Sequence, residues 1–124
     1  MHFLGKIDRE LYKCITDKIS TDKVILTNER IKHIISRRGQ NFYNRYKKEF
    51  IFILQNPDYI FYDKINTALV CKRLSIENKY INIVIRFAVS TESSTYKNSI
   101  ITVIEESEKR FQQRLRNHIP LYKK

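Results

Sequence analysis

His33 is the side chain in this sequence best suited to moving a proton near neutral pH. It lies in the stretch LTNERIKHIISRRGQ, between Arg30 and Arg37. On a helix these three residues share one face, because they are spaced three and four apart. Guanidinium groups beside an imidazole could bind a phosphate. Two interpretations stand at this point: His33 is an acid–base group in a phosphate site, or it is a polar residue on a basic helix.

Arg86 interrupts a stretch, KYINIVIRFAVS, that is otherwise rich in apolar and small residues. An arginine in mid-strand must face water, a carboxylate partner or a ligand. A phosphate ligand and a structural ion pair with Glu77, Glu105 or Asp63 are both compatible with the sequence. Arg86 is therefore a candidate for binding phosphate, with the ion pair as its alternative.

A third group of polar residues lies in STYKNSIIT, residues 94 to 102. Tyr96 could stack on a base, as aromatic residues do in single-stranded RNA sites. Ser99 and Thr102 are three apart, so in a regular strand they project to opposite faces, and only a bulge would bring both to one site. The alternative is an ordinary hairpin loop with Asn and Ser as turn formers.

The charge balance indicates the class of partner. Lys and Arg total 24 against 13 Asp and Glu, a net charge of +11. Such an excess is typical of proteins that bind polyanions, although it can also serve solubility alone. The sequence has no glycine-rich phosphate loop, nucleophile elbow or metal-ligand spacing, so we expect no metal and no cofactor. The absence of a carboxylate cluster disfavours two-metal nuclease chemistry.

The cysteines and the hydropathy indicate the cellular compartment and whether the chain crosses a membrane. Cys14 and Cys71 are far apart and lie in apolar-periodic stretches, which predicts two buried free thiols. No run approaches the roughly 18 apolar residues of a membrane span, and no signal peptide is visible. We therefore expect a cytoplasmic protein with no membrane partner, folded as one domain over residues 1–124.

Two helices are expected ahead of the strands. Thr27 is a good N-cap, Ile31, Ile34 and Ile35 form an apolar stripe, and Gly39 is a typical helix stop. A second helix is expected from about Asn41 to Gln55.

The pattern then changes to period two, which predicts four consecutive strands. Short polar links between them favour antiparallel neighbours. A last helix is expected from about Ser107 to Asn117.

The fold class is thus α+β: two N-terminal helices, a four-stranded antiparallel meander and a C-terminal helix. One sheet face should pack on the helices and the other can be open. Residues 1–23 have no clear prediction, and the strands are expected at 59–64, 67–76, 79–90 and 98–106.

Taken in order, ERIKHI, NPDYI, the arginine late in the third strand, and YKNSIIT resemble the phage-associated barnase–EndoU–colicin–RelE-like nuclease group (PBECR). The resemblance covers roughly residues 24 to 124. It implies the same helices and four-stranded antiparallel sheet, and metal-independent cleavage of RNA by attack of a 2′-hydroxyl on the adjacent phosphate. The family's first helix often continues as a histidine-bearing RH turn, whereas here Arg37 is followed by Arg38.

The resemblance also implies roles for individual residues. It picks His33 as general acid or base, and Arg86 for phosphate or transition-state charge. It places Lys97, Ser99 and Thr102 as polar positions in the same site, and Arg37 as a second phosphate contact.

The leading hypothesis is a toxin-like endoribonuclease of phage or mobile-element origin. Its RNA substrate, tRNA being one candidate, would lie across the sheet, and an antitoxin or immunity protein is a conceivable partner. The alternatives are a catalytically inactive RNA-binding or accessory domain and, with less support, a DNA-binding regulator. The expected RNA contacts come from the first helix, the loop and the last helix: Arg30, Arg37, Arg38, Tyr96, Arg110 and Arg114.

Overall fold

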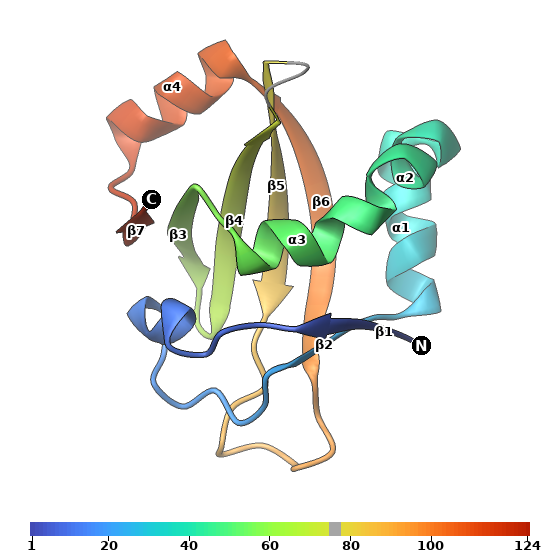
Figure 1. Cartoon of the computed structure of the whole chain (residues 1–124), viewed down its shortest axis with the longest axis vertical. Coiled ribbons are helices and arrows are strands. Elements are labelled where there is room, and N and C mark those ends of the chain that lie inside the picture. The colour runs from blue at the N-terminus through green and yellow to red at the C-terminus, as the bar shows by residue number, and fades with distance from the viewer. Residues whose placement is uncertain (75–77) are drawn as a thin grey trace.

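A seven-stranded mixed β-sheet forms the centre of the molecule (Figure 1). The structure is a computed structural model and describes residues 1–74 and 78–124. Across the sheet the strands run in the order β1-β2-β6-β5-β4-β3-β7. Their bounds are β1 His2–Lys6, β2 Lys23–Leu26, β3 Tyr59–Lys64, β4 Thr67–Leu74, β5 Lys79–Arg86, β6 Asn98–Ser107 and β7 Tyr122–Lys123.

The meander of β3, β4, β5 and β6 is antiparallel throughout. Side chains alternate along β5, so Ile81, Ile83 and Ile85 point into the larger core while Tyr80 and Val84 point to the other face. The expected strand 67–76 ends at Leu74 in the described chain, and its last two residues lie outside the described residues.

The expectation of a four-stranded sheet is wrong in extent, although the α+β class is confirmed. β2 joins β6 in parallel, with Val24 opposite Asn98 and Ile25 opposite Ser99. β1 then pairs antiparallel with β2, and β7 pairs antiparallel with β3. β1, whose residues carried no clear prediction, and β2 therefore extend the sheet beyond β6.

The first helix, α1 (Asn28–Arg38), begins and ends as expected. The Thr27 side chain accepts a hydrogen bond from the backbone N–H of Arg30 at 3.2 Å, and Gly39 ends the helix with a φ of 96°. The expected second helix is interrupted by a 3₁₀ turn. Its parts are α2 (Gln40–Tyr46), η2 (Lys47–Glu49) and α3 (Phe50–Gln55). A further 3₁₀ turn, η1 (Leu11–Cys14), follows β1.

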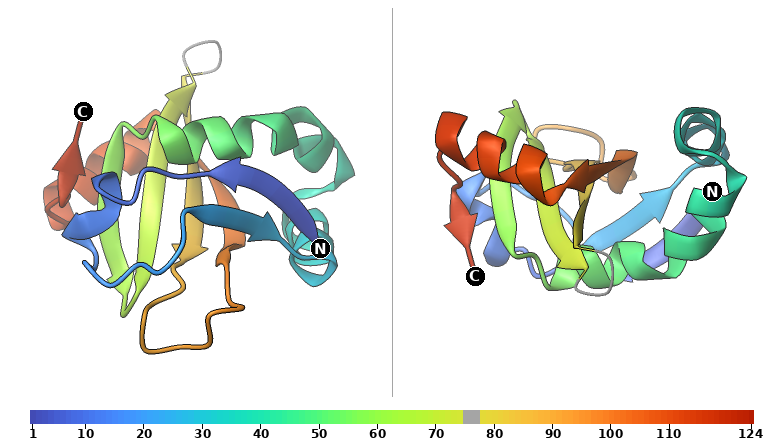
Figure 2. Two further views of the ribbon diagram at one scale, coloured as in Figure 1. Left: turned by 60° about the horizontal axis from the view of Figure 1, so that its bottom comes forward. Right: turned by 90° about the horizontal axis from the view of Figure 1, so that it is seen from above.

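The last helix, α4 (Glu108–Asn117), confirms the expected bounds, and Ser107 caps it. It lies on the opposite side of the sheet from α3 (Figure 2). Phe111 of α4 stacks on Tyr80, with ring centroids 3.6 Å apart. α4 therefore covers the second sheet face near Tyr80, whereas Arg86 lies at the opposite end of β5.

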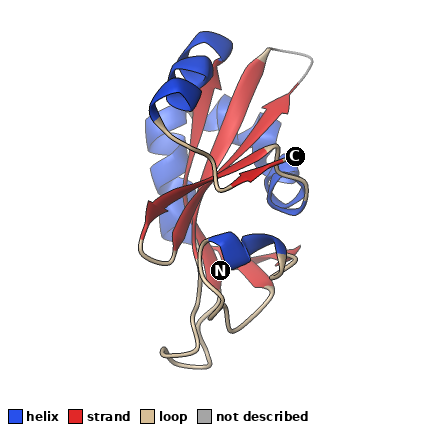
Figure 3. Cartoon of the chain, turned by 90° about the vertical axis from the view of Figure 1, so that its left-hand side faces the viewer, coloured by secondary structure: helices blue, strands red, loops and turns tan. Residues whose placement is uncertain are grey.

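Loops gather beyond the open end of the strands (Figure 3). The segment after η1 crosses the loop after β5, where Ile19 bridges to Val89 and Ser20 N–H donates to the Ala88 carbonyl at 2.9 Å. Cys71 is buried, but Cys14 is exposed, so the expectation of two buried thiols is wrong for Cys14. No helix in the described part of the chain is both long enough and apolar enough to cross a membrane.

Candidate functional site

One row of cross-strand neighbours runs over the open end of the second sheet face. Phe3 of β1 is opposite Ile25 of β2, Ile25 is opposite Ser99 of β6, and Ser99 is opposite Arg86 of β5. Cross-strand neighbours point to the same face of a sheet. Ser99 and Arg86 are therefore side by side, with an apolar wall beyond Ser99.

A β-bulge adds Thr102 to the same face. Val84 is opposite Thr102, but Ile85 is opposite Ile100, so Ile101 is the extra residue. A regular strand would send Ser99 and Thr102 to opposite faces. The bulge instead places both hydroxyls on the face that carries Arg86.

Helix α1 runs beside β6, on the stretch of that strand that β2 does not cover (Figure 1). It follows β2 directly, and β2 is parallel to β6, so α1 continues in the same direction along the edge. The Arg38 Nε–H donates to the Val103 carbonyl of β6 at 3.2 Å. Arg38 thus satisfies a carbonyl at the sheet edge, a structural role that was not expected for it.

The position of His33 follows from the handedness of α1. Ile31 and Ile34 pack into the larger core, on the α3 side of the sheet. An α-helix is right-handed and turns 100° per residue. With α1 at the sheet edge and α3 and α4 on opposite sides (Figure 2), we infer that the flank bearing Arg30 and His33 is turned toward the face that carries Thr102. His33 is half-buried there and, in the part of the chain that the structure describes, has no hydrogen-bond or ion-pair partner.

Arg86 forms an ion pair with Glu92, with 2.7 Å between Nη2 and Oε2. Its other terminal nitrogen donates to the Phe87 carbonyl. Glu92 in turn accepts from the Val89 N–H at 3.1 Å, which fixes the start of the loop after β5. The ion-pair alternative for Arg86 is thus realised with a partner that was not considered, whereas Glu105 pairs with Lys79 and Glu77 lies outside the described residues.

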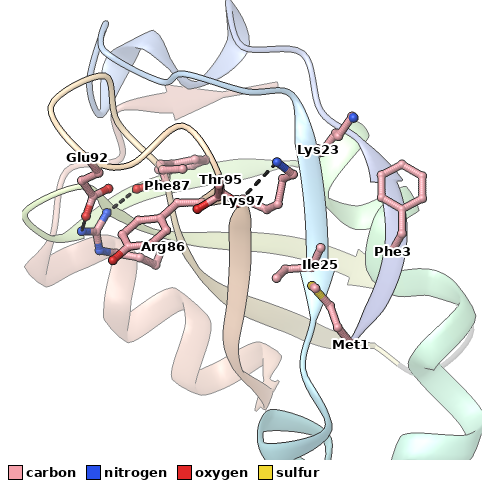
Figure 4. Close-up of a pocket in the computed structure, with 11 residues that line it drawn as sticks. Met1, Phe3, Lys23, Ile25, Arg86, Phe87, Glu92, Thr95 and Lys97 are labelled. Atoms are coloured by element: carbon pink, nitrogen blue, oxygen red, sulfur yellow. Dashed lines mark hydrogen bonds and ion pairs between the residues drawn. The ribbon is translucent and has the colours of Figure 1, made fainter.

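A hollow of about 670 Å³ opens over this end of the sheet (Figure 4). Two exposed aromatic side chains line it, Phe3 at 60% exposure and Tyr96 at 54%. Cations from three elements line it too, and the Lys97 ammonium also donates to the Thr95 carbonyl at 3.4 Å. The principal lining residues are Phe3, Lys23, Ile25, Arg86, Tyr96 and Lys97.

Asn98 anchors the loop that carries Tyr96 and Lys97, and it was missed in the sequence. Its side chain is fully buried. The carboxamide oxygen accepts from the Ala88 N–H at 2.9 Å, and the amide donates to the Thr21 carbonyl at 2.8 Å. Asn98 therefore ties both ends of this loop to the segment before β2. In the sequence Asn98 is only an asparagine before an apolar run, which is also typical of a turn former.

The two arginines expected on the last helix have different surroundings. Arg114 makes a bidentate ion pair with Glu106, at 3.1 and 2.8 Å, and Asn82 donates to the same carboxylate at 2.9 Å. This network fastens α4 to the sheet, so Arg114 has a structural role. Arg110 is exposed and lines a separate hollow with Arg114 and His118.

The ionisation of Glu106 reflects this network. Burial by itself would raise the pKa of Glu106. The hydrogen bonds from Arg114 and Asn82 and the nearby positive charges outweigh that effect and hold the pKa below its ordinary value. Glu106 is therefore a charged anchor of α4.

The candidate residues do not all lie in one place. Arg86, Tyr96 and Lys97 line one hollow, while Ser99 and Thr102 share their sheet face. Arg37 and Arg38 line a different hollow near Lys79 and Glu105. Among residues 1–74 and 78–124, no three His, Cys, Asp or Glu side chains are arranged to hold a metal ion.

Comparison of the chain with family models, with curated proteins and with solved structures finds no match.

Proposed function

We propose that this protein is an endoribonuclease that cleaves RNA without a metal, on the sheet face between α1 and α4. The observation that carries the proposal is the bulge at Ile101, which gathers Ser99, Thr102 and Arg86 on one face. Without it, one of the two hydroxyls would point into the larger core. The α1 flank that bears His33 adjoins this face.

Cleavage of RNA by its own 2′-hydroxyl sets three tasks. A base takes the 2′-OH proton while the 2′-oxygen bonds to phosphorus, the P–O5′ bond breaks, and an acid returns a proton to O5′. The phosphorane carries extra negative charge between these steps, and fixed cations stabilise it. His33 suits proton transfer, Arg86 and Lys97 suit the charge, and the hydroxyls of Ser99 and Thr102 can hydrogen-bond the phosphate oxygens.

RNA is the substrate that the surface favours. The net charge of +11 attracts a polyanion, and the exposed Phe3 and Tyr96 beside Lys23 and Lys97 suit a strand with accessible bases. If the chain belongs to the PBECR group, whose members have a barnase-like fold, RNA is again the expected substrate. Such membership would make the protein a cytoplasmic toxin of phage or mobile-element origin, neutralised by an antitoxin or immunity protein.

RNA binding without cleavage is the second candidate. It is favoured by the pairing of Arg86 with Glu92, because a carboxylate already occupies the guanidinium that a phosphate would need. In that case the hollow holds RNA and His33 has no role in chemistry.

Incubation of total RNA and tRNA with the protein in EDTA separates the two candidates. The endoribonuclease assignment predicts cleavage by the wild type and a loss of at least about 100-fold in His33→Ala and Arg86→Ala. His118→Ala and Arg116→Ala are matched controls, because both residues are exposed at the end of α4, and they should cleave normally. RNA binding with no cleavage by the wild type would favour the second candidate. Undiminished cleavage by His33→Ala and Arg86→Ala would exclude this face as the active site.

A further inference from the structure

The hollow beside Arg86 has a wall that the cleavage chemistry does not use. Phe3 comes from β1, Met1 directly precedes that strand, and Lys23 and Ile25 come from β2. Neither strand belongs to the antiparallel meander, and no chemistry has been assigned to either. Figure 4 shows the side chains of this wall across the hollow from Arg86 and Glu92.

The wall is held rigidly in place. Gly5 adopts a φ of 145°, and a Cβ at this position would lie 2.8 Å from Cγ1 of Ile51 in α3. The Gln55 side chain donates to the Lys6 carbonyl at 2.9 Å, and His2 hydrogen-bonds Asn28 at 2.8 Å. β1 is thus pinned to α3 at one end and to the start of α1 at the other. Phe3 nevertheless remains largely exposed.

The chemistry of the hollow indicates its occupant. Two exposed aromatic rings and the Ile25 side chain offer contact to a flat apolar ligand. Lys23, Lys97 and Arg86 surround these groups with positive charge. A ligand that combines a flat aromatic part with an anionic part satisfies both features, as a nucleotide in a single strand does. An acidic protein segment would satisfy the cations but leave the rings uncovered.

We propose that the hollow between the β1–β2 hairpin and the loop 87–97 binds an unstacked base of single-stranded RNA, with Phe3 and Tyr96 as its stacking platforms. Lys23 contacts a phosphate next to this base, while Lys97 keeps its role at the phosphate that is cleaved. This inference rests on the proposed action on RNA, and it assigns the N-terminal hairpin a role in substrate recognition. It makes single-stranded RNA, not duplex, the substrate class, because a base in a duplex cannot enter the hollow.

The test uses two fluorescent 2′-O-methyl RNA hexamers, which cannot be cleaved because the attacking hydroxyl is blocked. One carries bases, and the other is abasic with the same phosphates. The wild type should bind the base-containing hexamer more tightly. Phe3→Ala and Tyr96→Ala should each weaken that binding by about 10-fold and leave abasic binding unchanged. Lys23→Ala should weaken both hexamers alike and lower the salt dependence.

Tyr62→Ala is the matched control, because Tyr62 is a 58% exposed tyrosine on β3 that does not line the hollow. It should bind both hexamers like the wild type. Equal binding of the two hexamers, with no effect of Phe3→Ala, would overturn the base site while leaving cleavage in EDTA intact. Absence of both binding and cleavage would overturn the proposed function as well. A dimer in light scattering that Phe3→Ala dissociates would place a second copy of the chain in the hollow and also overturn the inference.

Discussion

Arg86 and Glu92 are joined by an ion pair, with 2.7 Å between Nη2 and Oε2, where β5 passes into the loop 87–97. Both side chains are partly exposed at the hollow, so an incoming phosphate would meet the carboxylate together with the guanidinium. Glu92 therefore orients Arg86 and at the same time competes with the phosphate.

Glu92→Gln should tighten RNA binding by about fivefold, because it removes one negative charge from the phosphate path. The glutamine oxygen can still accept from the Val89 N–H, so the loop keeps its anchor. Binding of the uncleavable hexamer at low salt measures the effect. Glu108→Gln, which breaks the Arg73 ion pair on α4, serves as control and should change binding little. Weaker binding by Glu92→Gln would show that orientation of Arg86 matters more than competition.

The bulge at Ile101 predicts that the hydroxyl of Thr102 contributes to cleavage. Thr102→Val keeps the shape of the side chain and should lower kcat by about 10- to 100-fold, because a hydrogen bond to the phosphate is lost. Thr102→Ser keeps the hydroxyl and should stay within a few-fold of the wild type. Single-turnover cleavage of a short RNA distinguishes them. If valine and serine variants cleave equally well, the hydroxyl has no part in the reaction.

The close packing of Gly5 against α3 predicts that a larger residue at this position destabilises the folded protein. Gly5→Ala should lower the free energy of unfolding by about 1 to 3 kcal/mol, from an unfavourable backbone conformation and from the clash with Ile51. Urea denaturation measures it. Gly39→Ala is the control for backbone strain alone, since Gly39 also has a positive φ but its added Cβ meets nothing within 4 Å. A Gly5→Ala variant no less stable than Gly39→Ala would contradict the close packing of β1 on α3.

Glu106 predicts a pH-dependent stability. Its pKa in the folded protein is below the ordinary value of 4.5, so folding stabilises the charged form. That stabilisation is fully present above 4.5 and is lost as the pH falls through the folded-state pKa. Glu106→Gln should lower the free energy of unfolding by about 3 kcal/mol at pH 7, because it leaves Arg114 without its partner charge.

The difference between Glu106→Gln and the wild type should shrink as the pH falls below 4.5, measured by urea denaturation at each pH. Glu10→Gln removes an exposed ion pair with Lys13 and should differ little from the wild type at any pH. A constant difference for Glu106→Gln across the pH range would mean that charge plays no part in anchoring α4.

Much of the fold could be predicted because its signals are local. The Thr27 cap, the Gly39 stop and the alternation in β5 each arise within a few residues of one another. The parallel pairing of β2 with β6 could not be predicted in the same way, since β2 has four residues and its partner strand lies far along the chain. The packing of α4 on the second sheet face could not be predicted either, because it depends on the Phe111–Tyr80 stack, which no local pattern reveals.

The candidate site was predictable in residue types but not in geometry. His33, Arg86 and Tyr96 could be singled out by chemistry alone, whereas the shared face of Ser99 and Thr102 depended on a bulge. The sequence SIIT is compatible with a regular strand and with a bulged one. The structural roles of Glu92 and Asn98 were not predicted, because a glutamate and an asparagine in a polar loop resemble ordinary turn residues.

The central claim is that this sheet face cleaves RNA by 2′-hydroxyl attack. The most direct measurement is mass spectrometry of the ends produced from a short single-stranded RNA in EDTA, with His33→Ala and Arg86→Ala in parallel. We predict fragments with 2′,3′-cyclic phosphate and 5′-hydroxyl ends from the wild type, and their loss in both variants. Fragments with 5′-phosphate and 3′-hydroxyl ends, or no fragments at all from the wild type, would contradict the claim.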